Sequence, residues 1–103
     1  MENLNENNNA IGNEEHINKL KNEIIKNKKI SDQELLELLL SYSTPQGSDT
    51  RAIAKRLLDK YINISNVLTV PLAILYEEVG SEAATLISLV KACALKSIWE
   101  NLE

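Results

Sequence analysis

The sequence predicts an all-α fold, organised as a compact bundle of five or six short helices. Leu, Ile, Val and Ala supply most of the 44% hydrophobic residues, whereas aromatic residues make up only 4% and Phe is absent. This composition suits interlocking helices better than a sheet. Apolar residues also recur at helical spacing along the chain, and 103 residues are enough for a single domain with one modest core.

The net charge and the cysteine content of the chain argue against several classes of function. A formal net charge of -4 argues against a strongly basic nucleic-acid binder, because phosphate affinity comes from clustered Lys and Arg. A single Cys excludes an internal disulfide. With one Cys and one His, a zinc site would also need carboxylate ligands, so no metal or cofactor is expected. The chain has no apolar run of membrane-spanning length and no signal-peptide pattern, so a cytoplasmic protein without membrane contact is expected.

The N-terminal part divides into an arm and a first helix. Residues 1–13 are rich in Asn and poor in apolar side chains, a composition that predicts a disordered arm. Apolar residues then recur at helical spacing through EEHINKLKNEIIKN, which predicts a helix over about residues 14–27 with His16 exposed on it. The helical domain is therefore expected to occupy residues 14–103.

A second helix is predicted to begin at the stretch SDQE, residues 31–34. This stretch matches a capping box, in which the Ser31 hydroxyl accepts from the amide of Glu34 and the Glu34 carboxylate reaches back to the Ser31 amide. The following leucines cover most of the helix circumference and leave only Glu34, Glu37 and Ser41 as a narrow polar stripe. This helix is expected to be the central and most buried one.

A third helix is predicted after the stretch STPQGS, residues 43–48, with Ser48 or Asp49 as its N-cap. One side of this helix is apolar and the other is basic, which is either a phosphate-contacting surface or an ordinary solvated face. The apolar side carries Ile53, Ala54, Leu57, Leu58 and Tyr61, and the basic side carries Arg51, Lys55, Arg56 and Lys60 together with Asp59.

The C-terminal part is predicted to contain two short helical segments and one long helix. Ser65 is the expected cap of a short turn, and Pro71 suits the first turn of a helix that runs to about Glu77 and stops at Gly80. The final helix is expected from about Glu82 to Leu102. Its buried face is predicted to include Ala83, Leu86, Ile87, Val90, Ala94 and Ile98, with Cys93 as a small buried side chain at its edge.

Two stretches of the chain resemble a known family. ISDQELLELLLSYSTPQGSDTRAIAKRLLDKY and NVLTVPLAILYEEVGSEAATLISLVKACAL look like the N-terminal domain of the RadC-like proteins, a bacterial family named for DNA repair. The likeness covers roughly residues 16–99. It implies a helical domain that ends in a helix-hairpin-helix, which in the family precedes a second domain of the JAMM metalloprotease type. That second domain would supply a His-x-His and a downstream Asp as zinc ligands, whereas this chain holds only His16, so the resemblance implies a non-enzymatic module.

The resemblance implies DNA binding at the hairpin, although the hairpin departs from the family pattern. Helix-hairpin-helix motifs usually show Gly, an apolar residue and Gly, whereas in EEVGSEAA only Val79 and Gly80 fit the last two places. The first hypothesis is weak, sequence-independent binding of DNA phosphates by the hairpin and by the basic side of the third helix. The residues expected to bind are Gly80, Ser81, Arg51, Lys55, Arg56 and Lys60. The alternative is a structural turn, since Glu77, Glu78 and Glu82 surround the hairpin with carboxylates.

The second hypothesis is a protein-interaction or scaffolding module without a nucleic-acid role. Leu95, Trp99 and Leu102 lie on one side of the last helix. They are expected either to close the core against the first helix or to form an exposed patch for a partner protein or for a domain that follows this one.

Overall fold

The computed structural model describes the backbone of residues 2–102 and the side chains of residues 14–102. Every regular element in this range is a helix, so the predicted all-α class is confirmed. The structure does not describe the side chains of residues 1–13, and the disorder expected there stays a prediction. The elements are α1 (Glu2–Ile25), α2 (Asp32–Ser41), α3 (Thr50–Tyr61), α4 (Ile64–Leu68), α5 (Leu72–Val79) and α6 (Ser81–Leu102).

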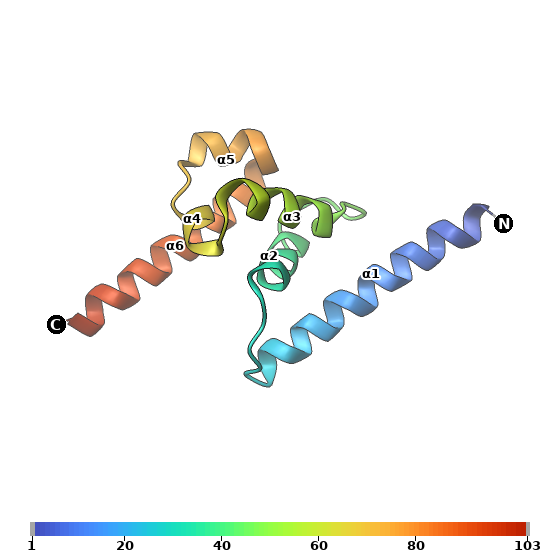
Figure 1. Cartoon of the computed structure of the whole chain (residues 1–103), viewed down its shortest axis with the longest axis horizontal. Helices are drawn as coiled ribbons and strands as arrows, with labels where there is room; N and C mark the ends of the chain where they lie inside the picture. The colour runs from blue at the N-terminus through green and yellow to red at the C-terminus, as the bar shows by residue number, and fades with distance from the viewer. Residues whose placement is uncertain (1, 103) are drawn as a thin grey trace.

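Helix α2 lies at the centre of the fold, as the leucine pattern predicts. It packs against α1 on one side and against α3 and α6 on the other, and Figure 1 shows α1 and α6 leaving this centre in different directions. Leu36 and Leu40 of α2 are fully buried and contribute to one core with residues of α3, α4, α5 and α6. The buried members of that core are Leu36, Leu40, Ala54, Leu57, Val67, Val70, Leu75, Ala83, Ala84 and Ile87.

Local signals fix most helix ends. The capping box at Ser31 and Glu34 is present in both directions, and Asp49 caps α3 by accepting from the amide of Ala52 at 3.1 Å. Helix α1 ends at Ile25, and Asn27 just beyond it has a positive φ of 57° that supports a Schellman-type pair of backbone bonds. The predicted cap at Ser65 is wrong, because Asn63 caps α4 instead and its side chain accepts from the amide of Asn66 at 2.9 Å.

Helices α5 and α6 are joined by Gly80 alone. The Gly80 amide donates to the carbonyl of Tyr76 at 3.0 Å and closes α5, and the Gly80 carbonyl accepts the first intrahelical bond of α6 from Ala84 at 3.0 Å. Gly80 has φ 85° and ψ 173°, a conformation that is essentially restricted to glycine. One residue thus ends one helix and begins the next, as the sequence predicts.

Ile62 ends α3 in an unfavourable backbone conformation. Its φ is 82° and its ψ is -51°, in a region that a β-branched residue rarely adopts. The side chain is 79% exposed and therefore adds little packing. Ile62→Gly is expected to raise the free energy of unfolding by about 1 kcal/mol, because glycine adopts this conformation without strain. Urea denaturation of Ile62→Gly and Ile62→Ala tests this, and a glycine variant less stable than the alanine variant would contradict it.

Candidate functional site

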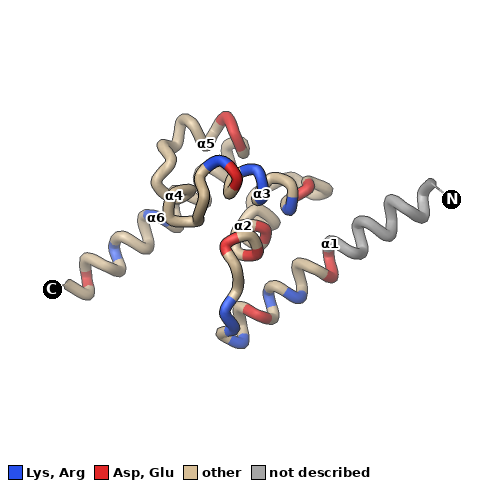
Figure 2. Tube along the Cα trace, viewed as in Figure 1, with Lys and Arg blue, Asp and Glu red and all other residues tan. Residues whose placement is uncertain are grey.

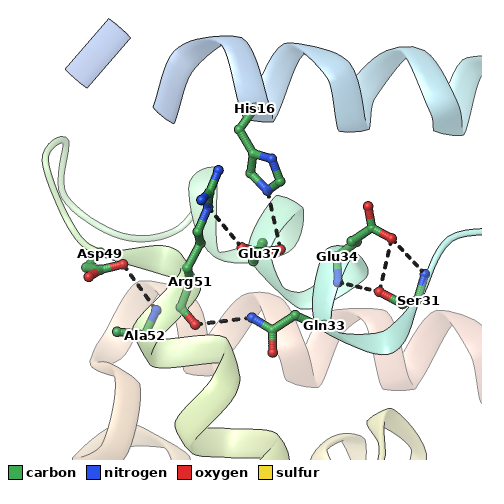
Figure 3. Close-up of polar contacts among 8 residues, drawn as sticks. All are labelled: His16, Ser31, Gln33, Glu34, Glu37, Asp49, Arg51 and Ala52. Carbon is green, nitrogen blue, oxygen red and sulfur yellow. Dashed lines mark hydrogen bonds and ion pairs between the residues drawn. The ribbon is translucent and has the colours of Figure 1, made fainter. Parts of the chain in front are cut away.

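Glu37 of α2 is a buried carboxylate held between two basic side chains. It is only 3% exposed, and Figure 3 shows His16 of α1 and Arg51 of α3 approaching it from two sides. His16 Nε2 lies 3.4 Å from Glu37 Oε2, and Arg51 Nε lies 3.5 Å from Glu37 Oε1. His16 is therefore partly buried at the contact between α1 and α2, and the expectation that it is an exposed helix residue is wrong.

Arg51, one of the residues predicted to bind DNA, pairs with Glu37. Arg51 points toward Glu37 and the side of the fold that α1 covers, and its backbone carbonyl accepts from the Gln33 side chain at 3.1 Å. Glu37 belongs to a helix whose apolar residues cover most of its circumference, and a charged residue in such a place needs a partner. The sequence therefore indicates that Glu37 is paired, but it does not show that Arg51 is the partner.

The other three cations of α3 also have partners in their own chain. Lys55 Nζ lies 3.2 Å from Asp59 Oδ2, one turn along the helix. Lys60 Nζ donates to Glu78 Oε1 at 2.7 Å, and Arg56 Nη2 donates to the backbone carbonyl of Glu78 at 3.3 Å. Figure 2 marks these basic positions in blue along α3, together with one acidic position in red.

Glu78 ties the end of α5 to α3. Its carboxylate accepts from Lys60 and also from the Tyr61 hydroxyl at 2.6 Å. Burial tends to raise the pKa of Glu78, but the two hydrogen bonds and the positive charges of Lys60 and Arg56 outweigh it, so the pKa lies below the ordinary carboxyl value. Hydrogen bonding to Glu78 and the charge of Glu78 in turn raise the pKa of Lys60.

Glu78→Gln is expected to lower the free energy of unfolding by about 1 kcal/mol at neutral pH, since Lys60 is exposed and the pair is partly screened. Because the folded-state pKa of Glu78 is lowered, this contribution is present above the ordinary carboxyl pKa and is lost as the pH falls through the lowered value. Thermal unfolding across a pH series checks it, with exposed Glu77→Gln as control. If Glu78→Gln still lowered the free energy of unfolding at acidic pH, the assignment of this contribution to the ionised Glu78 carboxylate would be wrong.

The predicted hairpin residues lie next to two of the α3 cations. Gly80 follows Glu78 by two residues, so Arg56 and Lys60 reach the same end of α5 that leads into the Gly80 turn. Ser81 is exposed, and its Oγ accepts from the Tyr76 hydroxyl at 2.9 Å. The structure thus brings Arg56, Lys60, Gly80 and Ser81 together and directs Arg51 elsewhere.

Lysines without a described acidic partner lie at the other end of the molecule. No ion pair within residues 14–102 involves Lys26, Lys28 or Lys29. These residues form the turn between α1 and α2, the blue segment at the lower end of α1 in Figure 2. The turn is distant in the sequence from Gly80, and no hydrogen bond or ion pair of the described residues joins the two.

The C-terminal half of α6 is exposed along its whole length. Residues 92–102 are all solvent-accessible, and in Figure 1 the red end of α6 extends away from the other helices. The predicted residues Leu95, Trp99 and Leu102 are 46%, 68% and 74% exposed, and Ile98 between them is 55% exposed. We refer to these four residues as the α6 stripe.

The exposure of α6 corrects two predictions from periodicity. Ile98 and Val90 are exposed although they continue the apolar spacing of the buried residues Ala83 and Ile87. Cys93 is also exposed and is not a buried side chain at the edge of the core. Helical spacing identifies a common face, but it does not show how far along the helix the rest of the fold covers that face.

No group of three or more His, Cys, Asp and Glu side chains within the described part of the chain is arranged to hold a metal ion. In the same part, none of the helices has both the length and the apolar character needed to cross a bilayer.

Comparisons with protein-family models, with curated proteins and with solved structures give no match to this chain. The RadC-like resemblance therefore rests on the quoted stretches of sequence alone.

Proposed function

We propose that this chain is a non-catalytic helical module that associates with protein through the α6 stripe. The observation that carries the proposal is the row of four large apolar side chains, each 46–74% exposed, on the exposed half of α6. Exposed apolar surface of this kind, with an aromatic residue at its centre, is typical of association surfaces. On the basis of the resemblance, we propose that this module is cytoplasmic and belongs to a RadC-like, repair-associated protein.

Photo-crosslinking in cells that produce the chain tests the association. A photoreactive phenylalanine analogue at position 99 is expected to give protein adducts that mass spectrometry can identify. The same analogue at position 97 is the matched control, because Ser97 is exposed on the opposite side of α6 from the stripe. Equal adducts from both positions, or none from position 99, would overturn the proposal.

DNA binding is the second candidate function. It is favoured by one specific observation, namely that Arg56 and Lys60 lie beside the Gly80 turn, so one phosphate backbone would meet the cations and the first amides of α6 together. Glu78 opposes it, because its carboxylate already occupies Lys60 and a phosphate would have to displace it. With Arg51 paired to Glu37, at most three cations of α3 could contact phosphates, so the salt slope on duplex DNA would be about -2.7, which corresponds to weak binding.

Fluorescence anisotropy with single-stranded, duplex and branched DNA across a salt series tests this candidate. Lys55→Glu is expected to weaken salt-dependent binding, and Lys96→Glu on exposed α6 is the control. Arg51→Glu is unsuitable, since it would place a second carboxylate against buried Glu37. Absence of binding to all three DNAs at low salt, or an equal effect of both variants, would reject DNA binding by α3.

A further inference from the structure

We infer that the α6 stripe is the contact surface of a symmetric dimer, and that its occupant is the same stripe on a second copy of this chain. This inference rests on the proposed association through α6 and goes beyond it by naming the partner. Two properties of the stripe support it, the symmetry of its spacing and the length of the exposed half of α6, and its exposed area then sets how tight the dimer would be.

The spacing of the stripe is unchanged when the helix direction is reversed. Leu95, Ile98, Trp99 and Leu102 are separated by three, one and three residues. Two antiparallel copies related by a two-fold axis between positions 98 and 99 would place Leu95 of one copy opposite Leu102 of the other. Ile98 and Trp99 would each face their own counterpart, so every residue of the stripe gains an apolar partner in a self-complementary interface.

The exposed half of α6 is long enough for this arrangement. With a rise of 1.5 Å per residue, the proposed axis lies about 11 Å from Lys91, where α6 becomes partly buried, and about 5 Å from Leu102. Positions 95–102 of the second copy would therefore lie beside positions 95–102 of the first, all of which are exposed. Figure 1 shows no other element beside this end of α6.

Charges next to the stripe are compatible with antiparallel pairing. Lys96 and Glu100 lie away from the centre of the stripe, and within one chain their charged groups are 3.5 Å apart. Around the helix, Glu100 lies about as far from the stripe as Ser97 does, so this ion pair stays outside the interface.

The exposed area predicts a weak dimer. Trp99, at 68% exposure, offers about 150 Å² of aromatic surface. With roughly 100 Å² from each of the other three side chains, the two copies together would bury about 900 Å², which is below the usual range for stable complexes. We therefore expect a dissociation constant in the roughly micromolar to 100 μM range.

Disulfide trapping tests the geometry. In a Cys93→Ser background, Ile98→Cys is expected to form an intermolecular disulfide quickly under mild oxidation, because position 98 faces its own counterpart across the axis. Ser97→Cys is the matched control, one residue away but on the opposite side of α6, and it should crosslink at least tenfold more slowly. Equal rates for the two variants would overturn the inference.

Sedimentation velocity of the unmodified chain tests the dimer without a variant at the interface. A concentration-dependent dimer is expected, together with a shift of Trp99 emission to shorter wavelength, since Trp99 is the only tryptophan in the chain. Trp99→Glu should remain a monomer with unchanged helix content. A chain that stays monomeric at high micromolar concentration would overturn the dimer, and identified adducts of another protein from position 99 would then leave the proposed association standing.

Discussion

Leu40→Ala is expected to lower the free energy of unfolding by about 3–4 kcal/mol. Leu40 is fully buried on α2 and belongs to the core formed with α3, α4, α5 and α6. Replacing a buried leucine by alanine loses the transfer free energy of the side chain and leaves a cavity, which together cost about 2–5 kcal/mol. For a domain of this size, whose total stability is about 5–15 kcal/mol, this is a large fraction.

Differential scanning calorimetry or thermal unfolding followed by circular dichroism measures this effect. The melting temperature should fall by roughly 12–32 °C, because 1 kcal/mol corresponds to about 4–8 °C in a domain of this length. Leu89→Ala is the matched control, since Leu89 is the same residue type on α6 but is 56% exposed. Similar shifts for the two variants would mean that α2 is not the centre of the core.

Gly80→Val is expected to lower the free energy of unfolding by about 2–3 kcal/mol and to disturb the junction of α5 and α6. At φ 85° and ψ 173°, Gly80 has a conformation that side-chain-bearing residues adopt only with strain of about 1–3 kcal/mol. No atom outside the immediate neighbours lies within 4 Å of a Cβ built at this position, so the cost comes from the backbone and not from a clash.

This distinction can be measured with two substitutions. If the backbone conformation sets the cost, Gly80→Ala should already lose most of the stability that Gly80→Val loses. Thr85→Ala, at an exposed position one turn into α6, provides the control and should change stability by less than about 0.5 kcal/mol. A tolerated alanine with a destabilising valine would instead indicate a steric limit. Because Gly80→Val strains the fold in either case, it cannot serve as a probe of DNA binding.

The parts of the fold predictable from sequence are those that local interactions determine. The capping box at Ser31 and Glu34, the cap at Asp49 and the stop at Gly80 depend on residues within four positions of each other, and all three are present. The leucines of α2 likewise identify the central helix, because a helix that is apolar around most of its circumference must be surrounded.

The parts of the fold that could not be predicted from the sequence depend on which helix surfaces pack against each other. The pairing of Glu37 with His16 and Arg51 joins three helices, and the contacts of Glu78 with α3 join residues 17 to 22 positions apart. Nothing in the spacing of the α3 cations shows that each has a partner in its own chain. The α6 stripe shows the same limit, since its periodicity predicts a common face but not the point at which the core ends.

The docking of α1 has a consequence for the motions of this protein. Within the described residues α1 packs mainly on α2, through fully buried Leu20 and the contact of His16 with Glu37, and Leu20 is not part of the main core. A helix held by so few contacts can detach while the remaining helices stay folded, as a separate cooperative unit. Native-state hydrogen exchange should therefore find the amides of residues 17–25 opening at a lower free energy than those of α2. Each opening would expose the Glu37 carboxylate to water, with Arg51 as its remaining partner.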